Sequence, residues 1–226
     1  DLKKKYFNIY NLVTNHNKNL INYIKKLKRK GQTVGAFQTR NIPHFGHELI
    51  LKKLLTKVNI VIINPVIGPK KKGDFNSSAL SKIFNYLSEK KFNNKIVFYP
   101  VVANMHYSGP REAIHHTILR KNLGFDYFTV GRDHAGADNF YDNFSAIRYI
   151  KKLKKKFDIK IITHKGTYFC KKCNRVTFYD DCSNQKKLIN ISGSNFRRCI
   201  IEKKIYKYAD TDLQNFIHNF KEQIFY

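Results

Sequence analysis

Apolar residues along the chain fall into alternating runs that predict strands and helices in turn. The short continuous runs VGAF at 34–37 and VNIVII at 58–63 are typical of strands covered on both faces. Apolar positions that recur every three or four residues, first between Asn17 and Lys30, indicate helices with one buried face. The alternation continues through helices near 77–90, 110–123 and 143–156 and strands near 95–101, 126–130 and 159–163. This pattern predicts an α/β fold, a Rossmann-like parallel sheet wrapped by helices, with ligands bound beyond the carboxyl ends of the strands.

Three segments lie outside this alternation. Residues 1–16 are too apolar for a free tail, and we expect them to dock onto the main domain at 17–205. Residues 164–189 interrupt the alternation and hold three of the four cysteines, which predicts a small cysteine-knuckle insert. Residues 206–226 contain an amphipathic pattern from Asp210 onward, which predicts a helix that packs on the domain or on a partner chain.

Composition fits one sizeable domain with a strongly positive surface. The 226 residues are 42% hydrophobic, and 43 Lys and Arg face 16 Asp and Glu, for a net charge of +27. This charge attracts nucleic acids and small anions alike, so it does not by itself separate an enzyme of anions from a nucleic-acid binder. Much of the excess is lysine, as on a solvated surface.

The chain shows no sign of a membrane or secretory segment. No apolar run is long enough to cross a bilayer, and no signal-peptide core follows the start at Asp1, which indicates a trimmed or processed chain. Closely spaced cysteines in such a chain favour a reducing compartment and metal binding over disulfides. We therefore expect a cytoplasmic location, with an organelle as the other reducing compartment.

Two histidines three residues apart follow the first predicted strand, in the segment QTRNIPHFGH. Pro43 and Gly46 allow a tight turn into the next helix, which places His44 and His47 near its start. Free backbone N–H groups and the helix dipole would face the same point, so the segment predicts a phosphate site. Taken alone, such a pair is more often structural.

Three further polar segments occur downstream at strand ends or helix starts. They are GPREAIHH at 109–116, GRDHAG at 131–136 and NISGSNFRR at 190–198. Together with QTRN and HFGH, and in the same order, they resemble the ATP sulfurylases (sulfate adenylyltransferases) of the HxGH nucleotidyltransferase superfamily. The resemblance covers about residues 17–200 and implies the HUP-type nucleotidyltransferase fold.

The resemblance implies a reaction and roles for the first segment. ATP sulfurylases convert ATP and sulfate to adenosine 5′-phosphosulfate and pyrophosphate, with Mg²⁺ on the phosphates. By this resemblance Gln38 and Arg40 hold sulfate, and Asn41 helps to position the phosphates. His44 and His47 stabilise the oxygens of the α- and β-phosphates.

The GRDHAG segment carries a second set of implied roles. Arg132 matches a catalytic arginine, Asp133 and His134 match nucleotide contacts, and the backbone N–H of Ala135 matches a sulfate contact. The simpler interpretation of this segment is an ordinary strand-to-helix turn with an Asp cap.

The segment MHYSGPREA at 105–113 resembles the family's MRYAGPREA, and Arg111 matches the family's nucleotide-binding arginine. Two positions depart from it, His106 in place of Arg and Ser108 in place of Ala. The first departure is expected to weaken anion binding, because imidazole is mostly uncharged at neutral pH.

The closing segment and one loop supply the remaining candidates. Ser192, Ser194 and Arg197 are expected to meet phosphate at a helix start, although Ser194 fits simple helix capping nearly as well. The loop at 64–74 also resembles a family loop, but its run Lys70 to Lys72 fits a solvated charge cluster better.

Cys170, Cys173 and Cys182 have the spacing of a zinc knuckle. Some sulfurylases carry a zinc insert at this point with a His soon after the third Cys, and this chain has none there. The candidates for a fourth ligand are His164, Asp180 and Cys199. A degraded site is the other interpretation, and a zinc ion here would be structural because the cluster lies outside the phosphate segments.

Two other functions compete with sulfate activation. One is nucleotidyl transfer to a different acceptor on the same fold, against which Gln38 and Arg40 argue. The other is a degenerate, non-catalytic nucleic-acid-binding homologue, which would rest on the charge of +27, the knuckle and the 14% aromatic content. The expected partners are ATP, sulfate, pyrophosphate and further copies of the chain in a homo-oligomer, with neither nucleic acid nor membrane.

Overall fold

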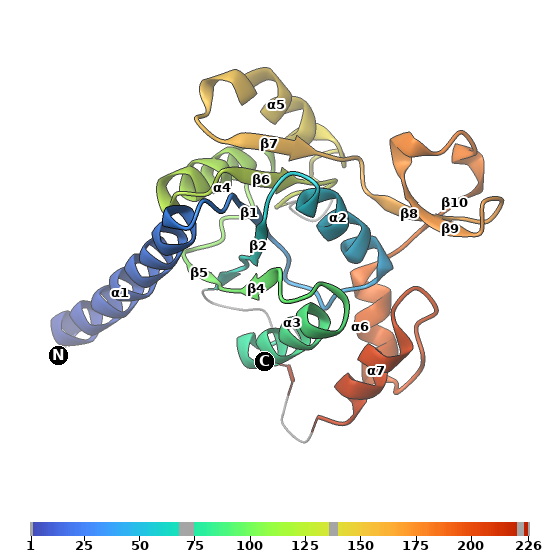
Figure 1. Ribbon diagram of the computed structural model, residues 1–226, viewed down its shortest axis with the longest axis horizontal. Coiled ribbons are helices and arrows are strands. Elements are labelled where there is room, and N and C mark those ends of the chain that lie inside the picture. The colour runs from blue at the N-terminus through green and yellow to red at the C-terminus, as the bar shows by residue number, and fades with distance from the viewer. Residues whose placement is uncertain (1, 68–74, 136–139, 221–223, 226) are drawn as a thin grey trace.

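The computed structural model describes residues 2–67, 75–135, 140–220 and 224–225, and only the backbone of 2–13 and 154 (Figure 1). A five-stranded parallel sheet forms its centre, in the order β4-β2-β1-β6-β7. The strands are β1 Val34–Phe37, β2 Ile60–Ile63, β4 Ile96–Phe98, β6 Tyr127–Val130 and β7 Lys160–Thr163. This confirms the predicted α/β fold with a parallel sheet.

Helices cover the sheet on both faces, which explains the continuous apolar runs. One core cluster joins the sheet to α2 Phe45–Leu55, α3 Ser77–Lys91, α6 Gly193–Ile201 and α7 Thr211–His218. The other joins it to α1 Leu2–Arg29, α4 Pro110–Leu123 and α5 Ser145–Leu153, which continues as the 3-10 turn η1 Lys154–Lys156. Alternate residues of one strand serve the two clusters, Ala36 one and Phe37 the other, as the two-residue period of a strand requires.

The central strand β1 is the point at which the strand order reverses. From β1 the chain builds β2 and β4 on one side, and β6 and β7 on the other. The loops that leave β1 and β6 therefore diverge, and a crevice opens between the carboxyl ends of these two strands. The segments QTRN and GRDHAG are those two loops.

The strand predicted at 95–101 is instead two short strands in different sheets. β4 ends at Phe98, and β5 Val101–Val102 pairs with β3 Val66–Ile67 in a separate two-stranded ribbon. Pro100 lies between them and has no N–H to continue the ladder, which accounts for the break.

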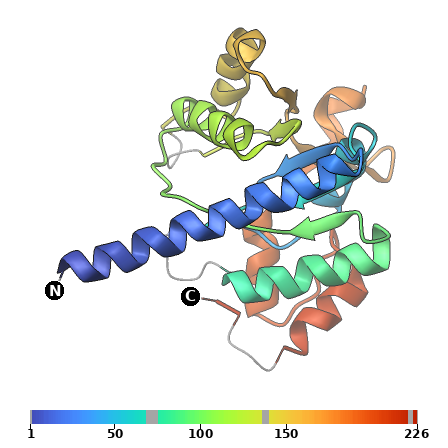
Figure 2. The same ribbon diagram turned by 60° about the vertical axis from the view of Figure 1, so that its left-hand side comes forward.

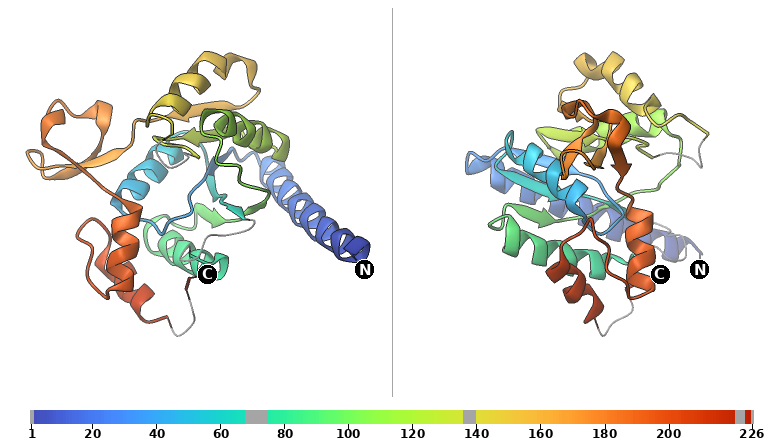
Figure 3. Two further views of the ribbon diagram at one scale, coloured as in Figure 1. Left: turned by 180° about the vertical axis from the view of Figure 1, so that it is seen from behind. Right: turned by 90° about the vertical axis from the view of Figure 1, so that its right-hand side faces the viewer.

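The N-terminal segment and the first predicted helix form one element. α1 runs without a break through the predicted boundary at residue 16, because neither Pro nor Gly occurs before Gly31, where the helix stops with a positive φ of 72°. Its first half extends beyond the sheet in Figures 2 and 3. The predicted docking of residues 1–16 depends largely on side chains outside the described part of the chain. No described helix has the length and apolarity to cross a membrane.

The predicted cysteine insert is a small antiparallel sheet, which we call the cysteine sheet. It contains β8 Thr167–Cys170, β9 Arg175–Phe178 and β10 Leu188–Asn190, in the order β10-β8-β9. The 3-10 turns η2 Tyr179–Asp181 and η3 Gln185–Lys187 lie between β9 and β10. Strands β8 and β9 pack beside α2, so the cysteine sheet adjoins the helix that carries the HFGH histidines.

The predicted C-terminal helix is α7, and it packs on the domain itself. Asp210 caps it, since its carboxylate accepts a hydrogen bond from the Leu213 N–H at 2.8 Å. Leu213 is fully buried, and the ring of Phe216 stacks on Tyr86 of α3 with ring centres 4.3 Å apart.

Candidate active site

A cavity of about 280 Å³ opens at the crevice between β1 and β6. Its lining includes eight of the residues that the sequence singled out for nucleotide or sulfate: Gln38, Arg40, Asn41, His47, Arg132, Asp133, His134 and Ala135. They come from the two diverging loops and from the first turn of α2. The fold therefore brings together residues that are up to a hundred positions apart in the sequence.

Five other candidates are not among the lining residues. Arg197 reaches the lining indirectly, since its Nη2 donates to Asn41 Oδ1 at 3.0 Å. Ser192 is the N-cap of α6, because its hydroxyl accepts from the Asn195 N–H at 3.3 Å. Ser194 is exposed and is not that cap, and Arg111 is exposed in the first turn of α4. His44, the fifth, is buried at the start of α2.

The start of α2 differs from the expected anion site. His44 Nδ1 accepts hydrogen bonds from the backbone N–H groups of Gly46 at 3.1 Å and His47 at 3.3 Å. The Phe45 N–H donates to the Tyr208 carbonyl at 2.9 Å. The expectation of free N–H groups at this helix start was wrong, because these donors already have acceptors within the chain. The N–H groups of Phe45, Gly46 and His47 therefore cannot serve an anion in the cavity.

The same hydrogen bonds fix the protonation pattern of the two histidines. The His44 N–H donates to His47 Nδ1 at 3.3 Å, which completes a reciprocal cap, and the two rings stack with centres 3.9 Å apart. Since each Nδ1 is an acceptor, each neutral ring carries its proton on Nε2. His47, which lines the cavity, therefore offers one ring donor without a positive charge.

Burial keeps the imidazoles of this region uncharged at neutral pH. Burial lowers the pKa of His44 to about 4, and burial followed by the neighbouring His44 and His164 holds the pKa of His47 well below its usual value. Burial, then the charge of Arg120, lowers the pKa of His134 to about 3. The positive charge of the cavity lining therefore comes from the guanidinium groups of Arg40 and Arg132.

These neutral histidines predict a loss of stability in acid. The folded-state pKa values of His44 and His164, both about 4, lie below the ordinary 6.5, so the unfolded chain binds more protons between these values. Stability should be full above about pH 6.5 and fall as the pH drops toward 4, by on the order of 1–3 kcal/mol per histidine. Melting temperature measured from pH 7.5 to 4.5 tests this. His44→Asn keeps a capping acceptor without a titrating ring and should lessen the slope, and a melting temperature that is level over this range would contradict the assignment.

A buried carboxylate shapes one wall of the cavity. Glu112 of α4 accepts hydrogen bonds from the backbone N–H groups of His106 and Ser108, each at 2.8 Å. This anchors the loop from which Met105 and Tyr107 line the cavity, with Tyr107 held at a positive φ of 54°. His106 itself is outside the lining, and the sequence analysis did not single out Met105 or Tyr107. Their position directly before the GPREA segment was the available signal.

His164 also lines the cavity, at the end of β7. Its ring is so close to Gly131 that a Cβ there would lie 2.7 Å from His164 Cε1. The sequence analysis considered His164 only as a zinc ligand, and its place after the strand next to β6 was the missed signal. The residues 68–74 of the predicted loop at 64–74, and Gly136 of GRDHAG, lie outside the described residues.

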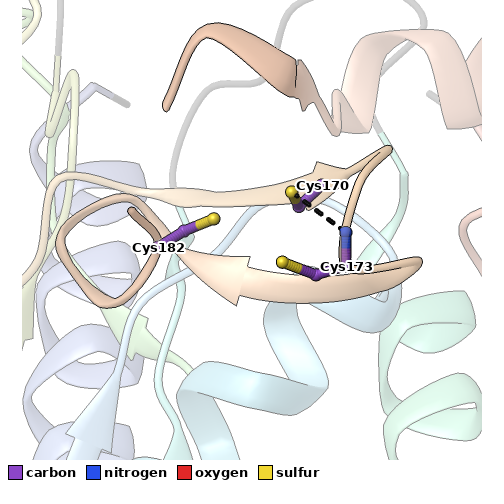
Figure 4. A group of neighbouring side chains, drawn as sticks. All are labelled: Cys170, Cys173 and Cys182. Carbon is purple, nitrogen blue, oxygen red and sulfur yellow. Dashed lines mark hydrogen bonds between the residues drawn. The ribbon is translucent and has the colours of Figure 1, made fainter. Parts of the chain in front are cut away.

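The three predicted cysteine ligands converge at one end of the cysteine sheet (Figure 4). The sulfurs of Cys170, Cys173 and Cys182 all lie within 4.8 Å of one another. In the described part of the chain no His, Asp, Glu or further Cys joins them: Asp180 pairs with Lys165 at 2.8 Å. The set fits a zinc ion with three thiolates, and the nearby Asn184 Nδ2, 3.6 Å from Cys173 Sγ, is no metal ligand.

Comparison with known proteins decides the family. A model of the ATP-sulfurylase family matches residues 16–206. The chain belongs to that family. The sulfate adenylyltransferase of Pyrococcus abyssi is 40% identical over 177 residues, which cover 77% of this chain and 46% of the relative. That of Ignicoccus hospitalis is 39% identical over 180 residues, 78% of this chain and 47% of the relative. This ATP sulfurylase chain thus spans about half the length of the curated relatives it matches.

A solved structure supports the fold independently. The hexameric APS kinase from Thiobacillus denitrificans superposes with a TM-score of 0.62 over 86% of this chain and 37% of that chain, at 15% identity. At this identity the likeness shows the shared fold.

Proposed function

We propose that this ATP sulfurylase domain transfers the adenylyl group of ATP to sulfate, which gives adenosine 5′-phosphosulfate and pyrophosphate. The observation that carries the proposal is the convergence of Gln38 and Arg40, from the loop after β1, with Arg132, from the loop after β6, on one cavity at the reversal of strand order. Membership of the ATP sulfurylase family supports it.

The reaction demands little proton transfer and much charge stabilisation. Sulfate is a dianion at neutral pH, so its oxygen can attack the α-phosphorus directly, and the bond from that phosphorus to the bridging oxygen breaks as pyrophosphate leaves with the electron pair. Negative charge then grows on the phosphate oxygens. Arg132 and the Nε2–H of His47 are the groups we assign to these oxygens, because fixed donors stabilise developing charge best.

The sulfate end of the cavity is assigned to Gln38, Arg40 and the N–H of Ala135. Gln38 Oε1 is buried without a hydrogen-bond partner among the described residues. Turning this amide over would place its NH₂ group there, as a donor for an oxyanion. Arg40 is exposed at the mouth, where it can draw sulfate in by charge.

The nucleotide end is assigned to the remaining lining. Val66 and Met105 supply apolar surface for the base, with Asp133 and His134 as polar nucleotide contacts. Asp133 is the one carboxylate in the described lining, so Mg²⁺ fits this site as Mg·ATP, held by phosphate oxygens and water. There the ion would neutralise phosphate charge.

Residues outside the lining receive supporting roles in this proposal. His44 acts through the cap of α2, and Arg197 acts through Asn41. Arg111 stays a predicted nucleotide contact, and Ser192 and Ser194 stay predicted phosphate contacts.

Pyrophosphate release from Mg·ATP tests the function. Release should depend on added sulfate or molybdate and fall when Arg40→Ala removes the positive charge at the sulfate end. Release that is equal with and without the oxyanion would point to another acceptor, and no release from folded, ATP-binding protein would overturn the proposal. If the folded, ATP-binding protein releases no pyrophosphate, salt-dependent binding of RNA or DNA would favour the nucleic-acid-binding alternative.

We also propose that the cysteine cluster holds one structural zinc ion. Metal analysis of protein purified without chelator should find about one zinc per chain, and Cys173→Ser should lose it together with part of the thermal stability, since such sites contribute folding energy. Cys199→Ser is the matched control, because Cys199 lies in α6 outside the cluster and its removal should leave zinc bound. Zinc-free wild type with an unchanged melting temperature would count against the site.

A further inference from the structure

The guanidinium of Arg132 is held by the cysteine sheet. Arg132 Nη1 donates to the Tyr168 hydroxyl at 2.6 Å, and Nη2 donates to Asn190 Oδ1 at 2.8 Å. The guanidinium carbon also lies 5.1 Å from the centre of the Tyr168 ring. Asn190 on β10 and Tyr168 on β8 are register partners, so two facing residues of adjacent strands form one cradle.

This cradle fixes a side chain that the loop carrying Arg132 cannot fix by itself. The loop leaves β6 and passes through left-handed backbone at Asp133 and Ala135, with φ of 51° and 55°, and its described residues form no helix or strand that could hold a long side chain. Free rotation of an arginine side chain must be suppressed, at a cost in conformational entropy, before its guanidinium holds one position. Two hydrogen bonds and a ring contact already suppress it before substrate arrives.

The chemistry of the two acceptors also suits an anion site. A phenol oxygen and an amide oxygen orient the guanidinium without cancelling its charge, whereas a carboxylate in either place would form an ion pair and consume that charge. The two bonds use two of the five N–H donors, and the others stay in the same plane for an oxyanion.

We propose that Tyr168 and Asn190 are positioning residues for Arg132, through which the cysteine sheet sets the geometry of the transferring phosphate group. The inference rests on the proposed adenylyl transfer. It gives the cysteine sheet a role in turnover in addition to any role in stability, because β8 carries both Tyr168 and, two residues on, the cluster residue Cys170.

Steady-state kinetics of sulfate-dependent pyrophosphate release provide the test. Tyr168→Phe and Asn190→Ala should each lower kcat about tenfold and change KM for Mg·ATP less than about twofold. Each variant loses one hydrogen bond to the Arg132 guanidinium, and this bond matters most in the transition state. In an Arg132→Lys background the same two changes should have little further effect, since an ammonium group cannot span both acceptors. Tyr179→Phe is the matched control, because its ring lies 5.6 Å from that of Tyr168 while, among the described residues, the side-chain hydrogen bonds of Arg132 go to Tyr168 and Asn190.

A further variant separates positioning from simple packing. Asn190→Asp keeps an acceptor for Arg132 but adds a negative charge, so it should lower kcat at least as much as Asn190→Ala, with an unchanged melting temperature. The inference would be overturned if Tyr168→Phe and Asn190→Asp kept the wild-type kcat, or if they lowered kcat equally in the wild-type and Arg132→Lys backgrounds. In that case sulfate-dependent release by the wild type would still uphold the proposed function. A wild type without that release would overturn both.

Discussion

Replacing His47 by alanine is expected to lower sulfate-dependent pyrophosphate release by about 100- to 1,000-fold, with the protein still folded. His47 lines the cavity, and its Nδ1 is occupied by the His44 N–H, so Nε2–H is its donor toward the phosphates. A neutral donor fixed in place stabilises charge that develops during transfer more than charge already present in ATP. The loss should therefore fall on kcat, measured with Mg·ATP and sulfate at saturation.

His44→Asn is the control for this prediction. Asparagine retains the capping acceptor for the Gly46 and His47 N–H groups, so turnover should fall less than about tenfold. Were His44→Asn as damaging as His47→Ala, the division into a capping and a reacting histidine would be incorrect.

Removal of the buried Arg120 side chain is expected to destabilise the fold by about 3–5 kcal/mol, a fall in melting temperature on the order of 10 °C. Arg120 of α4 is fully buried; its Nε donates to Asn64 Oδ1 at 3.0 Å and its Nη2 to the Asn64 carbonyl at 2.8 Å. Burial lowers its pKa to about 9, so the charge persists at pH 7. Arg120→Ala would leave the Asn64 oxygens without these donors and open a cavity against Phe128.

Arg120→Met separates the two contributions. Methionine refills most of the volume without any donor, so denaturant unfolding should show a smaller loss, about 1–3 kcal/mol, from the unpaired oxygens alone. Since the Asn64 N–H donates to the Phe37 carbonyl at 2.8 Å, Arg120 also ties α4 to the ends of β1 and β2 beside the cavity. Equal stability of Arg120→Ala and wild type would show that the buried charge contributes nothing net.

The sheet was predictable because both of its faces are buried, which leaves uninterrupted apolar runs such as those of β1 and β2. The strands of the cysteine sheet were not, because each mixes polar with apolar residues and so leaves no apolar run, while three or four residues are too few for an alternation to show. The resemblance identified eight lining residues from their segments. The cap by His44 could not be predicted from the sequence, because histidine is an uncommon N-cap and its acceptor role depends on the backbone geometry of one turn.

Individual residues whose contacts form only in the folded chain were the other failure. His164 and Glu112 act through positions that only the folded chain defines, one at the end of β7 and the other beneath the loop that carries Tyr107. Glu112 lies within the GPREAIHH segment, but its residue type does not mark it as the anchor of that loop, and the signal for His164 was its place after a predicted strand. The cradle of Arg132 was not predictable either, because Tyr168 and Asn190 come together only through strand pairing.

The central place of β1 has a consequence for synthesis on the ribosome. β1 hydrogen-bonds to β6, and 92 residues separate Val34 from its partner Asp126 at the start of this pairing. At about 5–20 residues per second, β1 waits on the order of 5–20 s for β6 after it has emerged, and meanwhile one edge of a fully apolar strand is open. An exposed strand edge of this kind can pair with another chain, so we expect the nascent domain to depend on chaperones that cover β1 until β6 arrives.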